Sequence, residues 1–176
     1  MSDYEWADQF RQVYDRATKH YRAGTRRPDG ICDSADTAFL ASIGCTAQEL
    51  FDFIDDLARR GEPSYETTLL ITALRRDYFR DVQKGVPSRA RVDMQKLPPK
   101  NEKLGGIEWL PRIIEKAKAK LRGEMPAELM YCCGGDVAFL KGFKIHPADF
   151  LKFVWSTDGD QQKILEYVRQ HGRQKG

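Results

Sequence analysis

The feature that most constrains this chain is an internal repeat at a spacing of one hundred residues. Residues 31–54 align without a gap with residues 131–154. Tyr4-Glu5-Trp6 also matches Ile107-Glu108-Trp109, if about three residues are inserted in the first copy. A repeat of this kind predicts two similar units, each of which buries its apolar face better when the other is present. The aligned identical pairs are Cys32/Cys132, Asp36/Asp136, Ala38/Ala138, Phe39/Phe139, Leu40/Leu140 and Phe53/Phe153.

Both copies show the apolar spacing of amphipathic helices, with hydrophobic residues at steps of three or four. A capping box, Thr46-Ala47-Gln48-Glu49, predicts the start of one helix, and Pro147 opens its counterpart. Ser34 or Asp36 is the expected N-cap of the short helix before it. We predict an all-α fold of two helical modules, about four helices each, related by internal duplication and packed as a pseudo-dimer. The expected first helices cover 6–21 and 109–121, and the expected last helices cover 64–82 and 160–171.

The composition of the chain changes between the two copies. Residues 1–83 form the predicted first module, residues 84–106 a basic linker rich in proline and glycine, and residues 107–176 the second module. Net charge is −4 over residues 1–83, +7 over 84–122 and zero over 123–176, which gives +3 in total. A possible short extended piece at 129–132 is the one departure from helix that we expect.

The overall charge is too weak to indicate nucleic acid as a partner. No apolar run reaches the roughly 18 to 20 residues of a membrane helix, and the charged N-terminus does not fit a signal peptide. We therefore expect a cytoplasmic protein that does not bind membranes. The four cysteines form no C-x-x-C pair, so we expect free thiols, no metal and no cofactor.

The most suggestive local feature is Cys133-Gly134-Gly135-Asp136. If a helix begins near Gly135, Cys133 lies at its N-terminus, where the helix macrodipole favours a thiolate. The two glycines would let a ligand approach the backbone N–H groups. Cys133 and Asp136 are therefore the candidate catalytic residues. The structural alternative is a packed thiol and an aspartate that caps the helix.

Two further candidates are less specific. Trp109 and Glu108 could line a ligand site together with Gly134 and Gly135, although a tryptophan at a helix start is also a common core anchor. Arg112, Lys116 and Lys120 are four residues apart and would form a basic ridge opposite the apolar stripe. Such a ridge could bind phosphate, RNA or an acidic partner, or it could simply be a solvated helix face.

The second half of the chain resembles a bacterial family, the domain of unknown function 5069. The resemblance covers about residues 92–171 and is carried by the run 104–112, by the helix that follows, and by Cys133 and Asp136 of a Cys-Pro-Leu-Asp motif. Gly134-Gly135 replaces the Pro-Leu pair of that motif, and Gly142-Phe143-Lys144-Ile145 departs from the family's F-L-G-I. The resemblance implies an architecture but no activity, cofactor or partner.

These observations favour a non-enzymatic binding or protein-interaction module for an unknown small molecule or protein. The alternative is a small thiol-dependent enzyme or redox sensor that uses Cys133 near Asp136. A weaker alternative is nucleic-acid binding through the basic linker and helix. The expected state is a monomer with pseudo-two-fold symmetry or a weak homodimer.

Overall fold

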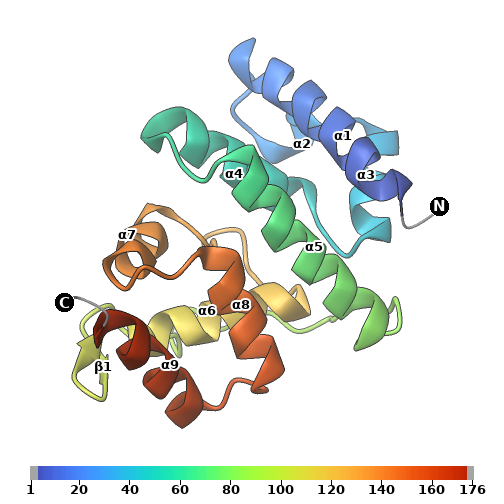
Figure 1. The fold of residues 1–176 in the computed structure, drawn as a ribbon. Helices are drawn as coiled ribbons and strands as arrows, with labels where there is room; N and C mark the ends of the chain where they lie inside the picture. Colours follow the sequence, from blue (N-terminus) through green and yellow to red (C-terminus); the bar gives the residue numbers. More distant parts are fainter. Residues whose placement is uncertain (1–3, 174–176) are drawn as a thin grey trace. The chain divides into compact units, whose positions relative to one another are not determined.

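A computed structural model describes residues 4–173, and this part of the chain contains nine helices and one hairpin of two short strands (Figure 1). The chain divides into two compact units, residues 1–85 and residues 86–176. The predicted helical class is therefore confirmed. Among the described residues, no helix is both long and apolar enough to cross a membrane.

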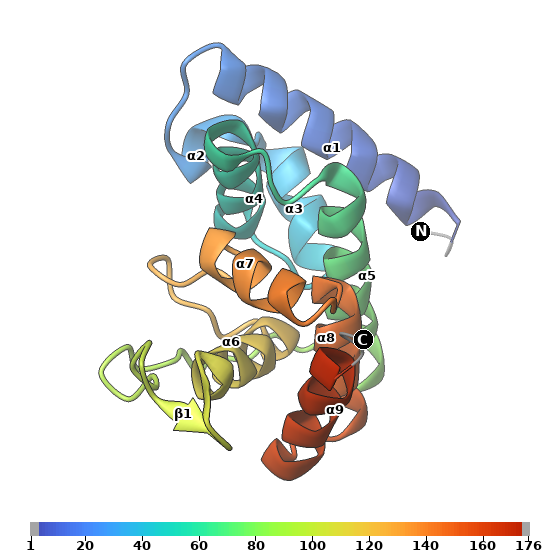
Figure 2. The same cartoon turned by 60° about the vertical axis from the view of Figure 1, so that its left-hand side comes forward.

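The first unit is built around its longest helix, α1. This helix packs against α2 and α4, which also pack against each other (Figures 1 and 2). Buried residues of α1 recur at helical spacing and form a hydrophobic core with residues from the other helices of the unit. The helices of this unit are α1 (Glu5–Arg22), α2 (Pro28–Ile31), α3 (Ser34–Ser42), α4 (Ala47–Arg60) and α5 (Tyr65–Asp81).

Side-chain caps determine where two helices of the first unit begin. The predicted capping box at α4 is confirmed, because the side chains of Thr46 and Glu49 each accept a hydrogen bond from the other residue's backbone N–H. The predicted N-cap of α3 is wrong by one residue. Asp33 is the cap, and its side chain accepts a hydrogen bond of 2.7 Å from the Asp36 N–H. Asp36 is the third residue of α3 and therefore lies inside the helix, where its carboxylate pairs with Arg16.

The second unit is arranged around α6, which packs against α8, α9 and the hairpin strand β1. Helix α7 packs against α8. The two strands of the hairpin are antiparallel, with Lys103 opposite Glu108. The elements of this unit are β1 (Lys103–Leu104), β2 (Ile107–Glu108), α6 (Leu110–Arg122), α7 (Gly134–Gly142), α8 (Pro147–Ser156) and α9 (Gln161–Arg173).

The segment that we predicted as a linker, residues 84–106, lies almost wholly in the second unit. The backbone N–H of Val92 donates to the Glu124 carbonyl at 3.0 Å, and Leu97 is buried. The segment also carries β1 and the tight turn at Gly105-Gly106, where both glycines have positive φ. The extended piece expected at 129–132 is wrong, because those residues form turns and irregular backbone.

Corresponding helices keep the spacing of one hundred residues. Helices α1 and α6 end at Arg22 and Arg122, and α3 and α7 cover residues 34–42 and 134–142. The buried pairs Val13/Ile113 and Ala17/Ala117 follow the same spacing. The insertion of about three residues that aligned Trp6 with Trp109 is therefore not supported by the helices, since Trp6 lies inside α1 and Trp109 precedes α6.

Tyr14 provides a test of the first unit's core. Its hydroxyl is buried and has no hydrogen-bond partner among the described residues, and burial raises the pKa of Tyr14 to about 12. The unfolded chain releases this proton near the ordinary pKa of 10.0, whereas the folded chain keeps it up to a pKa of about 12. The free energy of unfolding therefore falls as the pH rises from 10.0 to about 12.

We expect Tyr14→Phe to raise the free energy of unfolding at neutral pH by about 1 kcal/mol, because it removes an unpaired buried hydroxyl. The variant should also lose less stability than the parent above about pH 10. Urea unfolding across pH measures both effects, with Tyr4→Phe as the exposed control. A Tyr14→Phe chain that is clearly less stable at neutral pH would contradict this account of the hydroxyl.

Candidate functional site

The second unit contains a buried carboxylate, Asp136, in the first turn of α7. Its side chain is completely buried and accepts hydrogen bonds from three donors. The donors are Trp109 Nε1 at 3.0 Å, Lys116 Nζ at 2.5 Å and the backbone N–H of Cys132 at 2.9 Å. These contacts join three parts of the unit: the residue before α6, the middle of α6 and the turn before α7.

The ammonium of Lys116 compensates the charge of Asp136. The Lys116 side chain is only 3% exposed, so both charges of the pair are removed from water. Burying a single charge without a partner costs several kcal/mol, which makes the two residues dependent on each other. Lys116 Nζ also lies 3.2 Å from Cys133 Sγ and donates a hydrogen bond to the sulfur.

Cys133 lies at the N-terminus of α7, because that helix begins at Gly134. It is the N-cap residue, with φ −67° and ψ 167°, but its side chain makes no capping hydrogen bond. The thiol is half-buried, whereas the neighbouring Cys132 is fully buried. Cys132 adopts a left-handed conformation (φ 68°), and its N–H donates to Asp136. Cys133 is thus the cysteine of this pair that solvent can reach.

Trp109 closes one side of the site and explains why residue 135 is glycine. Trp109 is in the left-handed region (φ 69°), and its indole donates to Asp136. A Cβ atom at Gly135 would lie 2.8 Å from the indole ring, closer than normal contact distance. The glycine therefore provides space for a protein side chain. Lys100 Nζ lies 5.8 Å from the centre of the same ring.

The structure brings together Cys133, Gly134, Gly135, Asp136 and Trp109 among the predicted site residues. Glu108 does not join them, because it is exposed on β2 and forms an ion pair with Lys103 at 3.1 Å. The hairpin register produces this pair by placing the two residues opposite each other.

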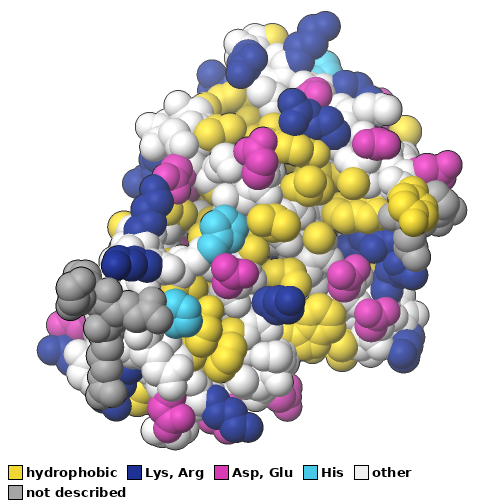
Figure 3. Space-filling view, in the orientation of Figure 1, with side chains coloured by type: hydrophobic (Ala, Val, Ile, Leu, Met, Phe, Trp, Pro, Cys, Tyr) yellow, Lys and Arg dark blue, Asp and Glu magenta, His cyan; other side chains and the backbone are white. Residues whose placement is uncertain are grey.

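The predicted basic ridge on α6 is wrong. Lys116 and Lys120 are 3% and 2% exposed, and Arg112 donates to the Pro98 carbonyl at 2.8 Å. A ridge opposite the apolar stripe would require one face of α6 to be open, but several elements of the unit pack around this helix. On the face drawn in Figure 3, Lys and Arg side chains are interspersed with Asp and Glu.

Sequence reasoning missed Lys116 as the partner of Asp136. A signal was present, because Arg16 and Asp36 occur one hundred residues earlier and form an ion pair in the first unit. The two pairs differ in solvent access. The Arg16 side chain is 48% exposed, whereas Lys116 is buried.

The first unit also contains a cysteine in a different electrostatic setting. Cys32 is half-buried, and burial, with additional effects from Asp36 and Asp33, raises its pKa to about 11. All four cysteines are free thiols. Within residues 4–173, no three side chains of the metal-binding types come together to hold an ion.

The fold and site define a small helical unit with a buried ion pair beneath a half-buried thiol. Residues 95–176, which make up most of this unit, match the family model of the domain of unknown function (DUF5069). This finding confirms the resemblance for the second half of the chain. The comparison with curated proteins gave no match, and neither did the comparison with solved structures.

Adding one methyl group at residue 135 tests the contact between Trp109 and Gly135. We expect Gly135→Ala to displace the indole and break its hydrogen bond to Asp136. The indole N–H resonance of Trp109 should then move toward its position in unfolded protein in a proton–nitrogen NMR spectrum. The spectrum of Trp109→Phe, which lacks this resonance, shows which indole signal belongs to Trp109.

Gly142→Ala is the matched control, since Gly142 lies in the same helix and a Cβ atom there meets nothing within 4 Å. This control should leave the resonance in place. An unmoved resonance in Gly135→Ala would show that the indole does not lie against residue 135.

Proposed function

We propose that the chain is a non-enzymatic, thiol-based sensor protein of the bacterial cytoplasm, with Cys133 as the sensing residue. The observation that carries this proposal is the distance of 3.2 Å between Lys116 Nζ and Cys133 Sγ. Reactive cysteines in proteins commonly lie beside a basic side chain or at a helix N-terminus. Cys133 has both features, because it also directly precedes α7.

The environment of Cys133 fits a sensor better than a purely structural thiol. Cys133 is half-buried as a residue, whereas Cys132 is fully buried, so Cys133 is the better candidate for contact with a small oxidant. Asp136 shares the ammonium of Lys116, and this sharing moderates the effect of Lys116 on the sulfur. The same sharing couples the state of Cys133 to a carboxylate that joins α6, α7 and Trp109. A change at the sulfur can thus alter the packing of the unit.

The reaction that we propose is oxidation of Cys133 by a hydroperoxide. The thiolate attacks the peroxide, an S–O bond forms and the O–O bond breaks, and the leaving oxygen takes a proton to become water or an alcohol. Cys133 is oxidised by two electrons to a sulfenic acid, and the peroxide is reduced. The added oxygen would compete with Asp136 for Lys116, which gives the event a structural consequence.

The output of such a sensor would be binding of a small molecule or a protein. No proposed step requires a cofactor or a metal. Nucleic-acid binding through α6 is not part of the proposal, because two of its three basic residues are buried. A monomer or weak homodimer remains our prediction for the oligomeric state.

We further infer that the two units arose by duplication of one module. The shared spacing of one hundred residues in α1/α6 and α3/α7 supports this inference. The ion pairs Arg16–Asp36 and Lys116–Asp136 at equivalent positions support it as well. The thiol function would belong to one copy, since Asp33 occupies the position equivalent to Cys133. Packing about a pseudo-two-fold axis stays a prediction.

Alkylation of the native chain tests the sensor proposal, with Cys32 as an internal control. Both thiols are half-buried, but Cys32 lies near carboxylates and Cys133 accepts a hydrogen bond from Lys116. We expect iodoacetamide at about pH 7.5 to modify Cys133 at least about tenfold faster than Cys32. Peptide mass spectrometry quantifies each site, and trapping with dimedone after hydrogen peroxide treatment detects the sulfenic acid.

Two variants of Lys116 separate the effect of its charge on Cys133 from its effect on folding. Lys116→Gln should slow alkylation of Cys133, whereas Lys116→Arg keeps the charge and should preserve much of the rate. Lys118→Gln, in the same helix but paired with Glu115, is the matched control and should leave the rate at Cys133 unchanged. Equal rates at Cys133 and Cys32, or a rate at Cys133 that is insensitive to Lys116→Gln in a folded chain, would overturn the proposal.

A further inference from the structure

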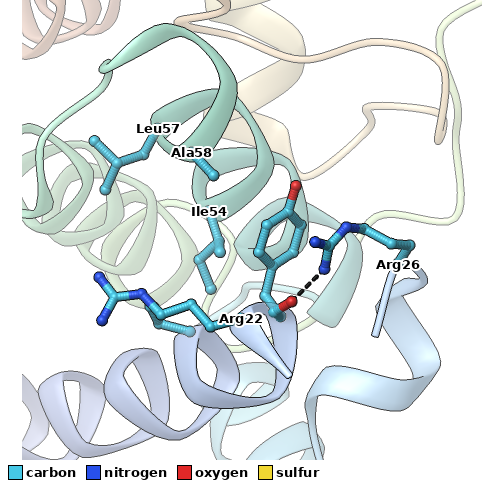
Figure 4. A pocket seen from close by; sticks show the side chains of 7 residues that line it. Arg22, Arg26, Ile54, Leu57 and Ala58 are labelled. Carbon is cyan, nitrogen blue, oxygen red and sulfur yellow. Dashed lines mark hydrogen bonds between the residues drawn. The ribbon is translucent and has the colours of Figure 1, made fainter. Parts of the chain in front are cut away.

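The first unit contains a pocket that the thiol site does not use. It lies between the C-terminal end of α1 and the exposed side of α4 and has a volume of about 480 Å³ (Figure 4). That volume is in the range of small-molecule sites in proteins. Only residues of the first unit line it.

The side of the pocket formed by α4 is apolar. Ile54, Leu57 and Ala58 come from successive turns of this helix and line the cavity (Figure 4). Ile54 belongs to the buried core, and Leu57 packs against the same cluster. An apolar group placed here would continue the core outward and lose contact with water, which is the main favourable contribution to binding of such a group.

The side formed by the end of α1 and the loop after it is basic. Arg22 and Arg26 are both exposed and line the pocket. Within residues 4–173, no carboxylate forms an ion pair with either of them. Asp55 of α4 accepts a hydrogen bond from the pocket residue Tyr21, but its ion pair is with Arg59. The pocket therefore has an uncompensated positive charge.

Arg26 is held in a defined position. Its Nη1 donates to the Tyr21 carbonyl, and its guanidinium lies 4.0 Å from the centre of the Tyr21 ring (Figure 4). A guanidinium has five N–H donors, so donors remain available for a ligand. Ordering of this side chain before binding lowers the entropy that a ligand would otherwise have to offset.

Thr18 also lines the pocket, and its Oγ1 has no hydrogen-bond partner among the described residues. This oxygen is closed to solvent, so it is not a contact for a ligand in the pocket. An unpaired buried hydroxyl normally costs stability.

We propose that this pocket binds a small amphipathic carboxylate, with its anionic head at Arg22 and Arg26 and its apolar chain against α4. Charge complementarity selects the head, and the row of apolar residues selects the chain. The site is separate from the thiol chemistry of Cys133 and does not depend on it. It gives the first unit a ligand of its own.

Calorimetric titration of the full chain with sodium octanoate tests the proposal. We expect saturable binding of one octanoate per chain, no measurable binding of acetate, and at least about tenfold weaker binding of octanamide, which lacks the charge. Arg22→Gln should weaken octanoate binding about tenfold without affecting folding, because Arg22 makes no ion pair within the described residues. Arg11→Gln, on the same helix but outside the pocket, is the matched control and should bind like the parent.

Two other variants probe the hydroxyl and the cavity. Thr18→Val should leave octanoate binding unchanged and the thermal midpoint unchanged or higher, because the lost hydroxyl is closed to solvent and unpaired in the free protein. Ala58→Phe should fill the cavity and abolish binding, and residue 58 is exposed enough to accept the larger side chain. Absence of saturable octanoate binding, or binding equal in Arg22→Gln and the parent, would overturn the proposal.

Discussion

The buried ion pair between Lys116 and Asp136 is the interaction on which the second unit depends. The two side chains are almost fully removed from water, and Asp136 also holds Trp109 and the backbone of Cys132. A buried charge pair contributes little net stability compared with a well-packed apolar pair, but losing one partner is costly. The pair therefore specifies how α6, α7 and the turn between them fit together, and it places an ammonium beside the thiol of Cys133.

The first unit has an ion pair one hundred residues earlier in the sequence, and that pair is more exposed to solvent. Arg16 takes the place of Lys116, and nearly half of its side chain is exposed. Solvent can hydrate the arginine when its partner is lost, but the Asp36 side chain is only 4% exposed, so loss of Arg16 leaves a buried carboxylate. With Asp33 as its N-cap, this unit has no thiol at the helix start. The two units thus have ion pairs one hundred residues apart in sequence and differ in the residue that precedes α3 and α7.

Helices were predictable from the sequence because their apolar spacing and caps are local, as the capping box of Thr46 and Glu49 shows. The grouping of side chains around Asp136 was only partly predictable from the sequence. The position of Cys133 at a helix start followed from nearby glycines, but the partnership with Lys116 depends on how two helices pack. The same dependence explains the failed ridge, since a lysine at regular helical spacing gives no local sign of being buried. The pocket near Thr18 was not predicted, because it depends on contacts between α1 and α4.

A double-mutant cycle at Lys116 and Asp136 tests the central claim most directly. Urea unfolding of the parent, Lys116→Met, Asp136→Asn and the double variant gives the coupling free energy between the two side chains. We predict a coupling of at least about 2 kcal/mol, because each single variant leaves a buried charge without its partner and the double variant removes both charges. The equivalent cycle at Arg16 and Asp36 should give a smaller coupling, because solvent can hydrate the Arg16 side chain. A coupling at Lys116 and Asp136 below about 0.5 kcal/mol would contradict the account, because the two groups would then not depend on each other.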